Sequence, residues 1–186
     1  MSRFVVKQTP IVGLQVIQRH LISDERGYFE RMFCSEELQS IIGSRKIVQI
    51  NHTQTAKAGV VRGMHFQHPP YAEMKFVSCL RGEVFDVAVD LRQESPTFLK
   101  WHAETLSQNN HKTFMIPEGF AHGFQALSDD CEMIYFHTAA YIREAEAGLN
   151  ALDARLAIDW PLTAIERSLR DQQHLMLTDD FVGIRL

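Results

Sequence analysis

The sequence predicts an all-β fold, a barrel or jelly roll with only a few short helices. Short segments in which apolar and polar residues alternate recur along the 186-residue chain, and turn residues separate them. Only one stretch has the features of a helix. Many short strands at turn spacing are typical of antiparallel barrels and jelly rolls. We find no internal repeat or linker, and we expect residues 1–186 to form a single domain, which is long enough to bury a core.

The expected strands follow one another from the N-terminus. Pro10 and Gly13 interrupt the first, and Arg81 with Gly82 predicts a tight turn between the third and the fourth. A further strand-like stretch covers residues 62–67. The other expected strands span residues 5–16, 46–55, 75–80, 83–91, 113–116, 123–127 and 131–138.

The segment 84–90 shows the alternation clearly. Even-numbered residues would share one face of a strand and odd-numbered residues the other. Asp86 therefore lies on one face among the small residues Val84 and Ala88, and Asp90 follows on the same face. An acidic residue among small side chains predicts a barrel with a partly polar interior.

One helix is expected over residues 35–42, because Ser35 is a suitable N-cap and Glu37 follows it. A further turn is expected near Glu144. Residues from 164 onward are less regular, and we expect this tail to pack across the mouth of the barrel.

Composition excludes several classes of protein. The formal net charge of −4 argues against nucleic acid as a partner, because phosphate binding needs a basic face. Cys34, Cys79 and Cys131 are too few and too scattered for a disulfide framework or a zinc cluster, and an odd number suits a reducing compartment. No apolar run is long enough to span a bilayer, and residues 1–20 lack the features of a signal peptide. We expect a cytoplasmic protein that binds no membrane.

Consecutive motifs carry a resemblance to a known family. The segment 62–67 places Arg62, His65 and Gln67 close together, and His122 follows the Pro117–Gly119 turn. The motifs run in order from about residue 11 to residue 171, at positions 24–29, 49–51, 59–67, 82–90, 95–98, 117–124 and 160–161. With these motifs the chain resembles the dTDP-4-dehydrorhamnose 3,5-epimerases.

The resemblance implies a fold, an assembly and a reaction. The fold is a cupin-type jelly roll, and the assembly is a homodimer in which one subunit lends its N-terminal segment to the other's site. The substrate is a nucleotide-diphosphate sugar with a ketone at C4 of a 6-deoxy sugar. The reaction inverts C3 and C5 in a deoxysugar pathway that supplies polysaccharide or a glycosylated product.

The chemistry explains the catalytic residues that the resemblance implies. The C4 ketone acidifies the hydrogens at C3 and C5, and a base of near-neutral pKa, such as a histidine, suits their removal. The family's base matches His65, and its carboxylate partner matches Asp171. Tyr135 matches the acid on the opposite face, and Lys75 matches the cation at the enolate oxygen.

Substrate contacts carry over in the same way. Arg62 matches a position beside the sugar and diphosphate, where a guanidinium fork suits the anion. The other matched binding positions are Arg26, Phe29, Gln49, Asn51, His122, Glu146 and Arg170. A purely structural role stays open for single residues: a histidine can be a hydrogen-bonded structural residue, Tyr135 can belong to the core, and Lys75 can lie on the surface.

The histidines also invite a metal hypothesis, because imidazole is a common metal ligand. Metal-binding cupins carry a His-x-His pair followed by a Glu. Here His65 and His68 are three residues apart, so a period-two strand puts them on opposite faces, and Glu73 does not complete the set. We therefore predict no metal and no organic cofactor. A metal-dependent cupin, such as a dioxygenase or a sugar isomerase, is the alternative from another class.

The match breaks in three respects. The family has a Glu where this chain has Arg31, with the acid moved to Glu30. After the catalytic Tyr the family has a basic residue and then a Tyr-Tyr pair, whereas residues 136–141 here read Phe-His-Thr-Ala-Ala-Tyr, so that Ala140 removes an aromatic ring. The hypothesis is that the chemistry is kept while the carrier or sugar differs, with CDP- or GDP-linked sugars as alternatives. An epimerase of C3 or C5 alone is a further alternative. A non-catalytic sugar-binding paralogue is disfavoured, because the base, the acid and the carboxylate are all present.

Overall fold

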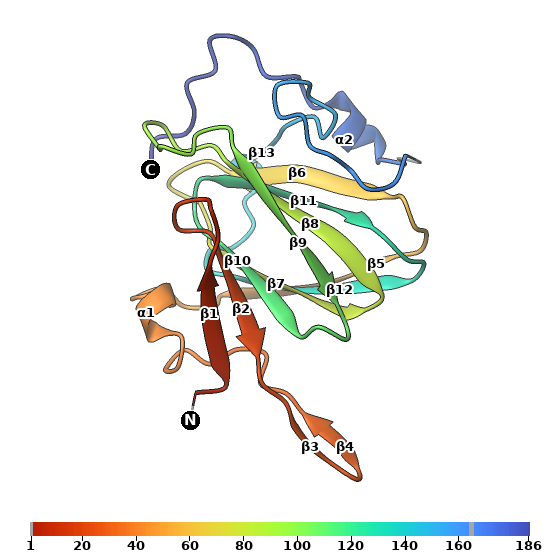
Figure 1. Cartoon of the computed structure of the whole chain (residues 1–186). Coiled ribbons are helices and arrows are strands. Elements are labelled where there is room, and N and C mark those ends of the chain that lie inside the picture. Colours follow the sequence, from red (N-terminus) through yellow and green to blue (C-terminus); the bar gives the residue numbers. More distant parts are fainter. Residues whose placement is uncertain (1, 164–165) are drawn as a thin grey trace.

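The computed structural model describes residues 2–163 and 166–186, which form two facing β-sheets (Figure 1). In the first sheet the strand order is β1 (Phe4–Gln8), β2 (Gln15–Arg19), β10 (Lys112–Ile116), β7 (Lys75–Arg81), β12 (Cys131–His137) and β5 (Gln49–Thr55). In the second the order is β13 (Glu146–Gly148), β6 (Val61–Gln67), β11 (Phe120–Ala126), β8 (Glu83–Asp90) and β9 (Trp101–Ser107). The predicted all-β jelly roll of cupin type is confirmed.

Alternation along the strands builds the core. Val84 and Ala88 on β8 pack between the sheets against residues of the six-stranded sheet such as Phe114, whereas Val87 and Val89 pack on the outer face under the C-terminal tail. The two faces predicted for residues 84–90 are therefore confirmed. A third cluster lies on the outer face of the six-stranded sheet, beneath α1 (Gln39–Ile42).

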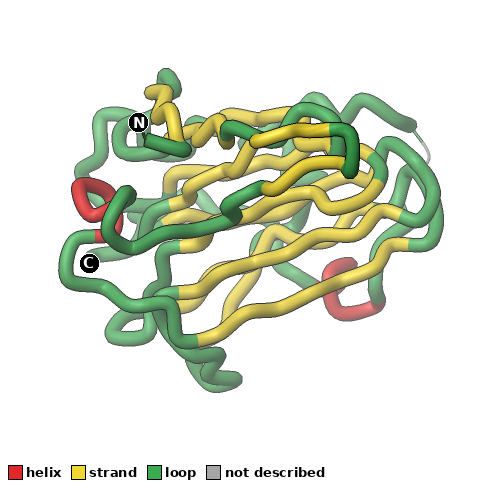
Figure 2. The backbone as a smooth tube through the Cα atoms, turned by 90° about the horizontal axis from the view of Figure 1, so that it is seen from below, coloured by secondary structure: helices red, strands yellow, loops and turns green. Residues whose placement is uncertain are grey.

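Two short helices lie far apart at the ends of the strands (Figure 2). The N-terminal one is shorter than predicted: it begins at Gln39, its N-cap is Leu38 without a side-chain hydrogen bond, and Ser35 caps nothing. Glu37 is engaged elsewhere, because it accepts a hydrogen bond of 2.6 Å from the backbone N–H of Arg3 and pairs with Arg31. None of the helices within residues 2–163 and 166–186 is long and apolar enough to cross a membrane.

Several elements differ from those the sequence predicts. The turn at Gly82 exists, with φ at 76°, but it carries the chain from one sheet to the other, so β7 and β8 do not form a hairpin. Sequence patterns also missed β9, β13 and the two short strands within residues 22–29. The tail was expected across the mouth of the barrel, but residues such as Leu177 and Ile184 pack on the outer face of the five-stranded sheet. Only its first part, which leads into the second helix, α2 (Leu169–Gln173), borders the space between the sheets, beside β6.

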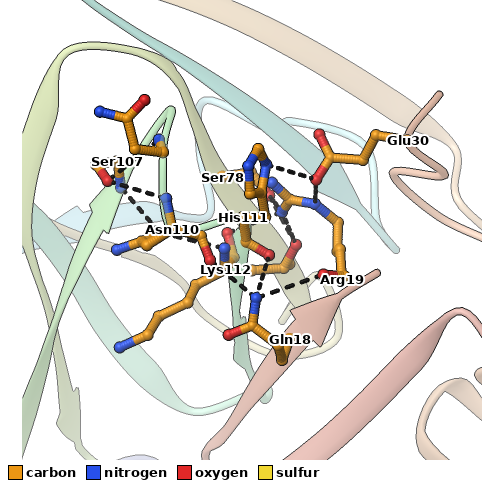
Figure 3. Close-up of polar contacts among 10 residues, drawn as sticks. Gln18, Arg19, Glu30, Ser78, Ser107, Asn110, His111 and Lys112 are labelled. Carbon is orange, nitrogen blue, oxygen red and sulfur yellow. Dashed lines mark hydrogen bonds and ion pairs between the residues drawn. The ribbon is translucent and has the colours of Figure 1, made fainter. Parts of the chain in front are cut away.

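Strands β3 (Ile22–Asp24) and β4 (Gly27–Phe29) form a hairpin that projects away from both sheets (Figure 1). Its two ends are joined by the buried Arg19, whose Nε donates to Glu30 Oε1 at 2.7 Å (Figure 3). The same guanidinium donates to Ser78 Oγ at 2.7 Å, and His111 Nδ1 lies 3.2 Å from Glu30 Oε1. This ion-pair network anchors the projecting hairpin to the six-stranded sheet.

Candidate active site

A cavity of about 680 Å³ opens between the two sheets and is closed on one side by the segment that leads into α2. Its volume is within the usual range for a small-molecule site. Strands β5, β7 and β12 supply one wall, and β6 and β11 supply the facing wall. Period-two alternation accounts for the first wall, because residues 49, 51 and 53 of β5 all point into the cavity.

A register shift between β6 and β11 shapes the facing wall. Arg62 and His65 are three residues apart and would lie on opposite faces of a regular strand, yet both line the cavity. The pairing of β11 with β6 shifts between His122 and Phe124, opposite Gly63. A Cβ at Gly63 would lie 2.5 Å from the Cα of Gly123, so glycine is required where the two strands approach so closely.

His65 and Asp171 form a hydrogen-bonded pair, with Nε2 and Oδ1 2.7 Å apart. The helix α2 positions the carboxylate, since Ser168 caps the helix by accepting a hydrogen bond of 3.1 Å from the Asp171 N–H. Burial alone would raise the pKa of Asp171, but the hydrogen bond and charge of His65 and the Gly63 N–H outweigh it, and the pKa is about 2. The carboxylate is therefore ionised and can only accept hydrogen bonds.

Tyr135 and Lys75 lie on the wall opposite this pair. Tyr135 is buried, and burial raises the pKa of its phenol, so the hydroxyl keeps its proton at neutral pH. The Lys75 ammonium is also buried, and its Nζ lies 3.1 Å from Glu73 Oε1. Lys75 thus lines the cavity and is not a surface lysine.

Most predicted substrate contacts converge on the cavity. The predicted contacts that line it are Gln49, Asn51, Arg62, His122, Glu146 and Arg170. The Arg170 guanidinium pairs with Glu146 at 3.1 Å, and His122 Nε2 lies 2.5 Å from the fully buried Asp86, whose pKa burial raises. The interior acid expected on the even face of β8 is thus a partner for a cavity histidine.

Arg26 and Phe29 do not reach this cavity. Both lie on the projecting β3–β4 hairpin, where Phe29 is 57% exposed and Arg26 pairs with Asp24 at 2.5 Å. Within the described chain, therefore, these two predicted contacts are not brought together with the others.

Other cavity residues escaped the sequence analysis. They include Thr53, Phe124, His137 and Arg167, while Gln67 and Glu73, which the sequence analysis mentioned without a role in substrate binding, also line the cavity. Glu73 Oε2 lies 2.6 Å from His137 Nδ1, so the cavity holds a second imidazole–carboxylate pair. Period-two spacing was an available signal, since Glu73 precedes Lys75 by two residues and His137 follows Tyr135 by two.

Of the residues first considered as metal ligands, His65 alone belongs to a group with suitable spacing. Within residues 2–163 and 166–186, the one group of His, Cys, Asp and Glu side chains close enough to share an ion is His65, Asp171 and His174. His68 and Glu73 do not belong to it.

The arrangement has the parts needed to move a proton next to a carbonyl group. An imidazole supported by an ionised carboxylate can act as a base, a protonated phenol on the facing wall can act as an acid, and an ammonium group can stabilise an oxyanion. Arginines at the rim can bind phosphate.

Known proteins are similar over nearly the whole chain. A sequence model of the family described as dTDP-4-dehydrorhamnose 3,5-epimerase matches residues 8–179. The dTDP-4-dehydrorhamnose 3,5-epimerase of Shigella flexneri is 42% identical over 158 residues, covering 84% of this chain and 87% of that protein. The one from Escherichia coli K12 is 39% identical over 183 residues, covering 97% and 98%. The dTDP-6-deoxy-D-glucose-3,5-epimerase of Legionella pneumophila, solved in complex with dTDP-4-keto-L-rhamnose, has a TM-score of 0.91 at 38% identity and 98% coverage of both chains. The matched region includes every residue that lines the cavity.

Proposed function

This chain belongs to the dTDP-4-dehydrorhamnose 3,5-epimerase family and is therefore an isomerase, and we propose that it inverts C3 and C5 of dTDP-4-dehydro-6-deoxyglucose to form dTDP-4-dehydrorhamnose. The observation that carries the proposal is the placement of the His65–Asp171 pair and Tyr135 on opposite walls of one cavity. A base and an acid on opposite faces of a sugar ring are what inversion through an enolate needs.

Each proton has a defined place in this reaction. His65 Nε2 lies 2.7 Å from Asp171 Oδ1, which only accepts, and 3.0 Å from Arg170 Nη2, which only donates. In the proposed reaction the shorter contact decides the tautomer, so that Nε2 carries the proton and Nδ1 keeps its lone pair. Nδ1 removes the hydrogen at C3 or C5 as a proton, and the electron pair moves onto the C4 oxygen. Lys75 donates a hydrogen bond to that oxygen. Tyr135 then delivers a proton to the other face of the carbon, and solvent restores both residues.

The anionic half of the substrate fits the cationic rim. Arg62 and Arg170 line the cavity and can bind the diphosphate. The thymidine carrier is the leading proposal. CDP- and GDP-linked sugars stay as alternatives, because the family uses a Glu for the nucleotide at the position where this chain has Arg31, and Arg31 is paired with Glu37. The chemistry needs no cofactor, and the proposed compartment is the cytoplasm.

We further propose a homodimer in which the β3–β4 hairpin of one subunit enters the partner's cavity. Exposed apolar side chains on the hairpin support it, since Tyr28 is 63% and Phe29 57% exposed. The edge strand β5 also exposes Ile50, at 58%, on the face that points away from the cavity, where it offers apolar surface to the partner subunit beside the cavity. Burying these side chains would gain hydrophobic free energy.

The reaction is tested by proton NMR of dTDP-4-dehydro-6-deoxyglucose in D2O. Loss of the C3 and C5 signals, absent with His65→Ala, is the expected result. Exchange at one carbon would identify a single-carbon epimerase. No exchange with the dTDP, CDP and GDP sugars would overturn the proposal.

The dimer is tested by mixing inactive variants. If hairpins act across subunits, a heterodimer of His65→Ala with an Arg26→Ala/Phe29→Ala chain contains one intact site, and activity returns. If each hairpin serves its own subunit, both sites stay defective. Light scattering of each variant alone checks that both still form dimers.

A further inference from the structure

His174 has an unusual position next to the proposed base. Its imidazole lies edge-on to His65, with ring centroids 5.7 Å apart, and its Nε2 lies 3.7 Å from Asp171 Oδ1. This Nε2 is buried and has no hydrogen-bond partner in the part of the chain that the structure describes. A buried polar atom without a partner is costly, so a ligand that bonds to it would bind favourably.

The packing around His174 holds the ring in this position. Gly148 on β13 has no side chain, and a Cβ there would collide with the imidazole. The carbonyl oxygen of His174 accepts a hydrogen bond of 3.1 Å from Asn150 Nδ2. The hydrogen bond to the His174 backbone and the close packing of Gly148 against the ring therefore hold the imidazole beside Asp171.

The three candidate ligand atoms are His65 Nε2, Asp171 Oδ1 and His174 Nε2, and all lie within 4.8 Å of one another. Metal–ligand bonds of about 2.0 Å in a tetrahedron place the donor atoms roughly 3.3 Å apart. The 2.7 Å separation of His65 from Asp171 must widen slightly, and the 3.7 Å separation of His174 from Asp171 must close by a similar amount. The third separation, between the two Nε2 atoms, is at most 4.8 Å and must also close toward 3.3 Å, and we infer that side-chain rotations supply all three changes.

From this geometry we infer that His65, Asp171 and His174 bind a divalent transition-metal ion of the Zn²⁺ class, and that the bound ion inhibits the isomerase. Two imidazoles and one carboxylate are a ligand set that Zn²⁺ accepts, and two of the three ligands, His65 and Asp171, line the cavity. A second shell is present, since the other Asp171 oxygen accepts a hydrogen bond of 3.2 Å from the Gly63 N–H. The inhibition, but not the binding, rests on the proposed function.

Inhibition follows from the protonation of His65. In the proposed reaction His65 Nε2 carries a proton and donates a hydrogen bond to Asp171, and Nδ1 is the base. An ion at Nε2 replaces that proton, and the neutral imidazole then carries its hydrogen on Nδ1. The lone pair that would remove the substrate's proton is no longer available, and Asp171 is occupied as a ligand.

One positive group opposes the ion. Arg170 Nη2 lies 3.0 Å from His65 Nε2, and its Nε lies 3.6 Å from Asp171 Oδ1. The side chain is 55% exposed and already pairs with Glu146 at 3.1 Å, so it can turn toward Glu146 and leave the ion's position. The inference therefore requires Arg170 to move.

Metal binding is measured first, without substrate. Protein freed of metal with a chelator is titrated with Co²⁺, and the visible d–d absorption of a four-coordinate site is followed; Zn²⁺ should then displace the Co²⁺. His174→Gln removes one ligand and should weaken Co²⁺ binding at least about 100-fold, more than the loss of an outer-shell partner does. His102→Gln is the matched control, because His102 also pairs with a carboxylate, Glu104 at 3.1 Å, but belongs to no such trio among the described residues.

The same variants then separate binding from inhibition. Zn²⁺ should inhibit the wild type and His102→Gln reversibly, whereas His174→Gln should keep most of its activity and resist Zn²⁺. An unchanged Co²⁺ spectrum, or equal Co²⁺ affinity in His174→Gln, overturns the metal site. Co²⁺ binding without Zn²⁺ inhibition overturns the inhibitory role. Absence of isomerase activity in the metal-free wild type would overturn the proposed function, while the Co²⁺ titration would still decide the metal site.

Discussion

Replacing Asp171 by Asn tests how the carboxylate supports His65. The side chain is 3% exposed and accepts hydrogen bonds from His65 and from the Gly63 N–H. Asn has nearly the same shape but no charge, and its amide nitrogen can only donate. One of the two contacts therefore faces a donor, and the positive charge that His65 gains during proton abstraction loses its counter-charge.

The pKa of Asp171 sets the size of the effect. A carboxyl whose pKa falls from 3.8 to about 2 has its ionised form stabilised by about 2 kcal/mol in the folded protein. Losing a similar amount at the transition state lowers kcat roughly 30-fold. Because the folded pKa is depressed, the matching contribution to stability is full above the unfolded pKa and is lost as the pH falls through about 2.

Two measurements check this reasoning, both in buffer with a chelator. Deuterium exchange at C3 and C5 compares kcat of Asp171→Asn with that of the wild type, and Asp179→Asn, an exposed carboxylate, is the control. Urea unfolding should show a stability loss of about 2 kcal/mol at pH 7 that shrinks to roughly half at pH 3. A variant with kcat within threefold of the wild type and an unchanged free energy of unfolding would refute the argument.

Three further predictions concern other parts of the molecule. Tyr135→Phe should still exchange substrate hydrogens through His65 but should invert far less of the sugar, as chiral analysis of the product would show; normal inversion contradicts it. Burial and a neighbouring thiol raise the pKa of Cys79 to about 12, so at pH 8 about one Cys79 thiol in 10⁴ is ionised. After treatment with an alkylating reagent, mass spectrometry should find Cys79 unmodified and the half-buried Cys34 modified; equal labelling of both contradicts this. Arg19→Met removes the guanidinium from the largely buried Glu30 and leaves only His111 beside it, and it should cost about 3–5 kcal/mol of stability in urea unfolding. A loss under about 1 kcal/mol would show that the network contributes little.

Local signals in the sequence are enough for the strands and for the faces they present. Side chains on a strand alternate whatever lies around them, so alternation alone assigns residues 84–90 to an interior and an outer face. The same alternation would have found Glu73 and His137. Helix 35–42 was misjudged at its start, because the Glu37 carboxylate is used by a backbone N–H more than 30 residues away.

Contacts between distant segments required the folded chain. His65 and Asp171 are 106 residues apart, and no local pattern relates a strand residue to a carboxylate in the tail. The joint exposure of Arg62 and His65 to the cavity depends on the close approach of Gly63 to Gly123, which shifts the register between two strands. Strand pairing and the packing of the tail depend on how the whole chain folds, whereas the alternation of side chains depends only on the backbone of a single strand.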